Sequence, residues 1–87
     1  MSGEFEIVNP LGLHARAASK FASLANKFKA DVWITKDGTE VNAKSILGVL
    51  MLACSQGSMI DLRCEGADAD KAFEALGKLI TSGFGEL

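Results

Sequence analysis

The stretch Asp31–Ala43, DVWITKDGTEVNA, decides the fold class, because it holds two strand-like runs joined by a two-residue turn. The runs 31–36 and 39–43 flank Asp37–Gly38, a pair suited to the positive φ angles of a tight hairpin. Trp33 alternates with aliphatic neighbours, so its side chain falls on the opposite side of the strand from theirs. The stretch therefore predicts an antiparallel hairpin with one buried face and one more open face that carries Trp33.

The segments on either side of the hairpin add two strands and three helices. Ser45 is a natural N-cap for a short apolar helix, and Gly83 is a natural stop for the last helix. Alternation and helical spacing of apolar residues predict strands over 4–8, 31–36, 39–43 and 59–65, and helices over about 15–27, 46–52 and 68–82. With every helix on one side of the sheet, the order βαββαβα predicts a two-layer α+β sandwich.

Length and composition narrow the class of protein. A chain of 87 residues that is 48% hydrophobic forms a single domain, 1–87, with one core. The net charge of −2 argues against a nucleic-acid binder, which needs a clear basic excess. The longest apolar run, 46–54, is too short to span a bilayer, so we expect a cytoplasmic protein without a membrane partner. Cys54 and Cys64 show no paired spacing and are expected as free, buried thiols.

The stretch NPLGLHARAASKF, residues 9–21, places the single histidine at the start of the first predicted helix. If that helix begins at Ala15, the amides of Ala15, Arg16 and Ala17 lack intrahelical partners and can bind an anion. The positive end of the helix dipole also favours a neutral, nucleophilic ring at His14. A nucleophile beside an anion site suits phosphoryl transfer onto the ring, and the forked Arg16 guanidinium can bind the phosphate oxygens.

Other interpretations of His14 are possible from the residues alone. A lone histidine at a helix start is often only a cap or a surface residue. One histidine and two separated cysteines do not make a metal site, so neither a metal nor a cofactor is expected. The chain also has no strained nucleophile elbow of a serine hydrolase and no phosphate-cradling glycine loop.

The residues around His14 resemble the phosphorylation-site signature of HPr, the histidine-containing phosphocarrier of the bacterial phosphotransferase system. The resemblance begins at LGLHARAA and continues through KDGTEVNAKSILGVLMLA to EGADADKAFEALGKLI, which covers nearly the whole chain. It implies an open-faced sandwich with sheet order 1-4-2-3. It also implies that His14 accepts phosphate at Nδ1 from phospho-enzyme I and donates it to an EIIA-type protein, with Arg16 binding the phosphate. Such a protein is a carrier and a substrate of its partners, expected as a monomer, rather than an enzyme.

The sequence departs from the usual pattern of this family at the site and at its C-terminal end. Ala17 stands where the family commonly has proline, which restores one amide donor at the cost of some stiffness in the first helical turn. The ending LITSGFGEL resembles the nitrogen-related branch more than the sugar-transporting branch. The assignment between these two branches therefore stays open at this point.

Ser45 and the short apolar helix carry the remaining candidates. The resemblance implies that an HPr kinase phosphorylates Ser45, which would add negative charge next to the docking surface. Leu47 and Met51 are expected in an apolar patch near His14, ringed by Arg16 and Lys20, that docks donor and acceptor, although the helix could instead be entirely core. The rival function is a regulatory binding module of the same fold that acts through Ser45 and this patch.

Overall fold

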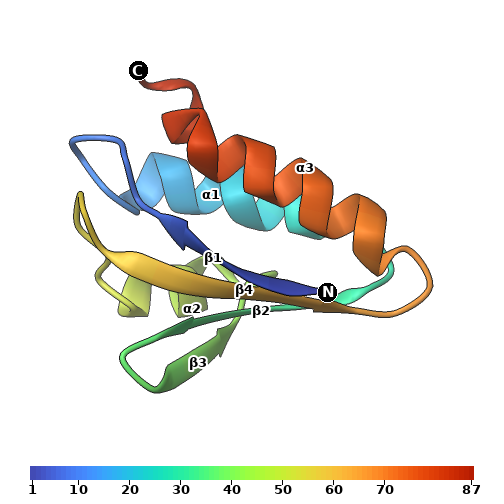
Figure 1. The fold of residues 1–87 in the computed structure, drawn as a ribbon. Helices are drawn as coiled ribbons and strands as arrows, with labels where there is room; N and C mark the ends of the chain where they lie inside the picture. The colour runs from blue at the N-terminus through green and yellow to red at the C-terminus, as the bar shows by residue number, and fades with distance from the viewer.

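The hairpin predicted from the sequence forms one edge of a four-stranded antiparallel sheet in the computed structural model, which describes residues 1–87 (Figure 1). Asp37 and Gly38 adopt φ angles of 49° and 80°, the left-handed pair that a tight turn between twisted strands requires. The elements in chain order are β1 (Ser2–Glu6), α1 (Ala15–Ala25), β2 (Asp31–Lys36), β3 (Thr39–Asn42), α2 (Ile46–Met51), β4 (Met59–Glu65), α3 (Ala69–Thr81) and a 3₁₀ turn, η1 (Gly83–Gly85).

The strand order is β1-β4-β2-β3, which confirms the expected order 1-4-2-3. The last strand, β4, lies between β1 and β2 and pairs antiparallel with both, with Phe5 opposite Ile60 and Ile34 opposite Leu62. The two hairpin strands pair with Ile34 opposite Val41. The first and last strands of the chain are thus neighbours in the sheet.

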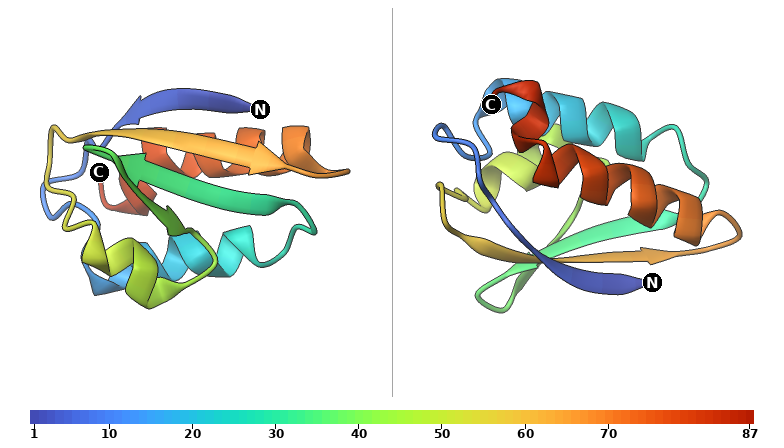
Figure 2. Two further views of the ribbon diagram at one scale, coloured as in Figure 1. Left: turned by 90° about the horizontal axis from the view of Figure 1, so that it is seen from below. Right: turned by 45° about the horizontal axis from the view of Figure 1, so that its top comes forward.

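Helices α1 and α3 cover one face of the sheet, and α2 packs against α1 and β3 (Figures 1 and 2). The inward residues of β2 and β4 are fully buried beneath them, as alternation predicted. Both cysteines are free and buried, as expected, and burial raises the pKa of each thiol. None of the helices combines the length and the apolar character needed to cross a membrane.

Helices α1 and α3 leave the other face of the sheet uncovered, as the view from below shows (Figure 2, left). Trp33 is half-buried there, and the Arg63 guanidinium lies 5.6 Å from the centre of its ring. Arg63 also pairs with Glu40 at 2.8 Å and with Glu65, so charged groups cover the indole. The prediction that Trp33 lies on the face opposite the core is confirmed.

Most element bounds agree with the predictions, and the differences have local reasons. The strand predicted over 4–8 lies over Ser2–Glu6, so it begins two residues earlier and ends two residues earlier. Its pairing continues at Ile7, whose amide donates a hydrogen bond to the Ser58 carbonyl and whose carbonyl accepts one from the Gly57 amide. The predicted helix 15–27 ends at Ala25 with Asn26 as its C-cap, because from Lys27 on the amides donate three residues back, Lys27 to Leu24 and Phe28 to Ala25, rather than four. These residues form turns that close the helix.

The C-terminal tail folds back over the start of α1. Gly83 adopts φ 66° and ends α3, as predicted. Phe84 then enters the core with no exposed surface, and its ring packs edge-on against that of Phe21 at 6.4 Å between centroids. The Lys20 ammonium donates a hydrogen bond to the Phe84 carbonyl at 2.8 Å, which ties the tail to α1. This return of the chain brings Glu86 next to His14.

Candidate functional site

The loop before α1 is fixed by backbone contacts that leave no room at Gly12. Gly12 adopts φ 66°, and a Cβ at this position would lie 2.3 Å from the Cys54 carbonyl oxygen. The same oxygen accepts a hydrogen bond from the Leu13 amide at 2.9 Å. The residue before His14 is thereby held against the segment that follows α2, so the position of the ring does not depend on the loop alone.

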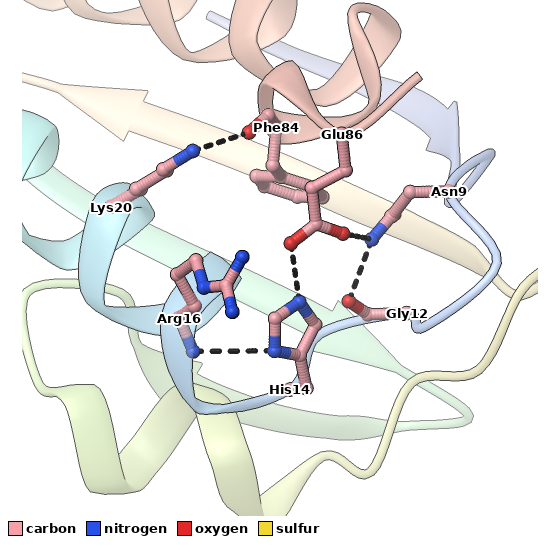
Figure 3. Close-up of polar contacts among 7 residues, drawn as sticks. All are labelled: Asn9, Gly12, His14, Arg16, Lys20, Phe84 and Glu86. Carbon is pink, nitrogen blue, oxygen red and sulfur yellow. Dashed lines mark hydrogen bonds and ion pairs between the residues drawn. The ribbon is translucent and has the colours of Figure 1, made fainter.

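His14 is the N-cap of α1, as the sequence predicted. Its backbone is extended, with φ −74° and ψ 178°, and its Nδ1 accepts a hydrogen bond from the Arg16 amide at 3.3 Å. The other ring nitrogen, Nε2, lies 2.5 Å from the Glu86 carboxylate (Figure 3). A quarter of the side chain is exposed. The ring is therefore held at both nitrogens and remains open to solvent.

The Glu86 carboxylate determines which nitrogen of His14 is nucleophilic. The hydrogen bond from the Asn9 amide, together with His14 and the nearby charge of Arg16, holds the pKa of this carboxyl below its ordinary value, although burial acts in the opposite sense. An ionised carboxylate can only accept, so His14 Nε2 carries the proton and donates. Nδ1 therefore carries no proton, and its lone pair, which accepts from the Arg16 amide, makes it the nucleophilic nitrogen at the helix N-terminus.

The predicted anion-binding groups belong to the first turn of α1, which His14 caps. No hydrogen bond in the structure involves the Arg16 guanidinium, which turns toward His14 and Glu86 (Figure 3). Ala15 and Arg16 are exposed at the helix start, whereas Ala17 is fully buried. An open hollow of about 420 Å³ adjoins the site, lined by Pro10, Leu11, Arg16, Lys20, Gly85 and Glu86.

The structure adds a second use for Lys20, whose docking role stays a prediction. Its ammonium donates a hydrogen bond to the neutral Phe84 carbonyl, so it ties the tail to α1 and keeps its positive charge at an exposed position. Leu47 and Met51 are 74% and 81% exposed on α2, so the helix is not entirely core. Ser45 is exposed, and its hydroxyl accepts a hydrogen bond from the Gly48 amide at 3.1 Å, which makes it the N-cap of α2 as predicted.

Two residues of the site were missed by reasoning from the sequence. Glu86 stands 72 residues from His14, and nothing in the sequence around it marks a carboxylate that returns to the helix start. Asn9 looked like a turn residue next to Pro10, yet it is fully buried and contacts Glu86. The only available signal was indirect, since Gly83 and Phe84 at the chain end allow a reversal that buries an aromatic ring.

Comparison with known proteins shows the family of the chain. The family model described as "PTS HPr component phosphorylation site" matches residues 1–82. The chain is 52% identical over 81 residues to the phosphocarrier protein HPr of Neisseria meningitidis, covering 93% of this chain and 91% of that protein. It is 45% identical over 80 residues to the phosphocarrier protein NPr of Shewanella violacea, covering 92% and 88%.

A solved structure of HPr-C-His from Thermoanaerobacter tengcongensis superimposes with a TM-score of 0.96 at 46% identity, covering 100% of this chain and 98% of that one. The sequence matches and the fold match thus indicate the same family. The chain belongs to the HPr family, the phosphocarriers of the phosphotransferase system.

Proposed function

We propose that His14 Nδ1 carries the phosphoryl group, accepting it from phospho-enzyme I and donating it to an EIIA-type protein. The observation that carries the proposal is the contact of Nε2 with Glu86, which leaves Nδ1 as the nitrogen with a lone pair at the start of α1. In the forward step the Nδ1 lone pair attacks phosphorus and the donor leaves with the electrons of its bond. The ring then carries phosphate on Nδ1 and its original proton on Nε2, so no proton needs to leave.

The group passes on by the reverse step. The nucleophile of the acceptor attacks phosphorus, the Nδ1–P bond breaks, and its electron pair returns to the ring as the neutral Nε2–H form. Because the ring leaves as neutral imidazole, the Nε2 proton held against Glu86 keeps the phosphoryl group transferable. The protein ends each cycle as it began, as a carrier requires.

The groups that would hold the phosphate oxygens are the amides of Ala15 and Arg16 and the Arg16 guanidinium. The positive end of α1 faces the product, and the guanidinium breaks no hydrogen bond in order to reach it. The Ala17 amide is the third donor predicted from the sequence, in the same first turn of α1.

Leu47 and Met51 form the core of the proposed docking surface. Both side chains are largely exposed on α2, which packs against the same helix whose start holds His14. A modest apolar patch fits partners that bind in turn and must dissociate, since transient interfaces are small. We expect the protein to act as a monomer in the cytoplasm, with Lys20 and Arg16 contributing positive charge beside this patch.

Incubation with phosphoenolpyruvate and enzyme I tests the proposal. We expect one acid-labile phosphate per chain, absent in His14→Ala. Arg16→Ala should slow transfer by roughly tenfold or more, since hydrogen bonds to charged groups are worth about 1.5 to 3 kcal/mol. Arg63→Ala, on the open face of the sheet, is the matched control and should transfer at the normal rate. Acid-labile phosphate on His14→Ala would overturn the assignment.

A second function, regulatory binding through Ser45, is favoured by the exposure of that hydroxyl at the start of α2 and by the similarity to an NPr protein. Phosphorylation by an HPr kinase would add close to two negative charges beside Leu47 and weaken docking of acidic partners. With ATP and an HPr kinase, an acid-stable label is expected on the wild type and not on Ser45→Ala. A label that persists in Ser45→Ala would exclude this residue as the target.

A further inference from the structure

Asn9 is the one polar or charged residue in the buried set, with no exposed surface. Its side-chain amide donates to the Gly12 carbonyl at 2.9 Å and to Glu86 Oε1 at 2.8 Å (Figure 3). Its Oδ1 has no hydrogen-bond partner, and a buried acceptor without a partner costs roughly 1 to 3 kcal/mol. Both N–H donors of this buried side chain bond to groups of the site while its acceptor stays unpaired, which indicates a functional role.

Asn9, Glu86 and His14 form a chain of hydrogen bonds through one carboxylate. Glu86 Oε1 accepts from Asn9, and Oε2 accepts from His14 Nε2 at 2.5 Å. The three residues come from the loop before α1, the end of the tail and the N-cap of α1. A carboxylate that orients an imidazole needs its own support, because a rotation of its side chain would release the ring.

We propose that Asn9 is a positioning residue that acts through Glu86, fixing the carboxylate on the Nε2 proton of His14 so that Nδ1 stays the free nitrogen. This inference rests on the proposed function of His14. It explains why an amide, rather than a second carboxylate or an apolar group, occupies the position: only a donor can hold a carboxylate there.

The hydrogen bond from Asn9 to Glu86 also affects what Arg16 can bind. Its guanidinium lies close enough to Glu86 to affect that carboxyl group, yet the two form no ion pair. A Glu86 side chain released by Asn9 would be drawn to Arg16, and that pairing would take both groups away from His14. The amide of Asn9 therefore keeps Glu86 on the ring and leaves Arg16 free for phosphate.

The tail can serve this purpose because it is anchored upstream of Glu86. Phe84 is fully buried against Phe21, and Lys20 holds the Phe84 carbonyl. The Glu86 backbone is thus fixed, and its amide bonds to the Gly83 carbonyl at 3.0 Å. The backbone contacts leave the orientation of the Glu86 side chain to be set, and Asn9 donates a hydrogen bond to its carboxylate.

The first test uses a signal that needs no partner protein. In the wild type, the proton on His14 Nε2 should give a slowly exchanging NMR signal downfield of the backbone amides. We expect the signal to disappear in Glu86→Gln and to weaken or shift upfield in Asn9→Ala. Asn26→Ala is the matched control, because the Asn26 amide also donates to two carbonyl oxygens, those of Ala22 and Lys44, away from the site.

The second test asks whether Asn9 acts through Glu86. Transfer from phospho-enzyme I should fall about tenfold in Glu86→Gln and in Asn9→Ala, and the double variant should be no slower than Glu86→Gln alone. Glu74→Gln, which alters an exposed carboxylate on α3, is the control and should leave the rate unchanged.

The outcomes separate this inference from the proposed function. If Asn9→Ala costs the same factor in the Glu86→Gln background as in the wild type, Asn9 does not act through Glu86 and the inference is overturned. A wild-type Nε2 proton signal that survives Glu86→Gln also overturns it, whether or not Asn9→Ala folds. If the wild type shows the signal and its loss in the variants but takes no phosphate, the proposed function fails while the positioning chain stands.

Discussion

Replacing Gly12 with alanine tests whether close packing fixes the loop that presents His14. Two costs follow from the structure. A residue other than glycine is destabilised by about 1 to 2 kcal/mol at a positive φ such as the 66° found here. In addition, the new Cβ would lie 2.3 Å from the Cys54 carbonyl oxygen and 2.9 Å from Ser55 Cα, both of which are backbone atoms that cannot rotate away.

Relieving this overlap would move the oxygen that accepts the Leu13 amide. Leaving a buried amide without a partner costs about 1 to 3 kcal/mol. We therefore expect Gly12→Ala to lower the free energy of unfolding by about 3 kcal/mol. It should also slow transfer to His14, because the loop must shift.

Gly38→Ala is the matched control. Gly38 also has a positive φ, 80°, but a Cβ there would meet no atom within 4 Å. In this variant only the positive φ should lower the free energy of unfolding, by about 1 to 2 kcal/mol. Urea denaturation followed by circular dichroism gives both values. Equal losses of stability in the two variants would refute the argument from packing, because the positive φ would then explain the whole effect.

Two further predictions concern the tail and the start of α3. Phe84→Ala should cost about 3 to 5 kcal/mol in urea denaturation, since the ring is fully buried, and a loss below about 1 kcal/mol would show that the tail is not part of the core. The Asp68 carboxylate accepts the amides of Lys29 and Ala30 at 3.0 and 2.8 Å, and the Lys29 bond in particular lowers its pKa. Because the folded pKa lies below the unfolded value, this stabilisation is complete above about pH 4 and is lost as the pH falls through the folded pKa. Asp68→Asn should therefore be less stable at neutral pH and depend less on pH in the acid range, and an unchanged acid dependence would contradict this.

Local pattern determined most of the fold. The hairpin at Asp37–Gly38, the strand Met59–Glu65 and the N-caps His14 and Ser45 all lie where the sequence placed them, since turn residues and caps act over a few neighbouring positions. The bounds that differed lie at frayed ends, where pairing or helical hydrogen bonds weaken gradually rather than stop at one residue.

The sequence by itself also determined the centre of the site, a histidine at a helix N-terminus with arginine two positions on. Only the tertiary structure decided which of its nitrogens is free. That depends on Glu86 and Asn9, which lie 72 positions after and 5 positions before His14, and on the burial of Phe84 that brings the tail back. A carboxylate near a chain end is normally solvated, and no sequence pattern marks its partner. Which group it contacts depends on how the helices pack and not on local propensity.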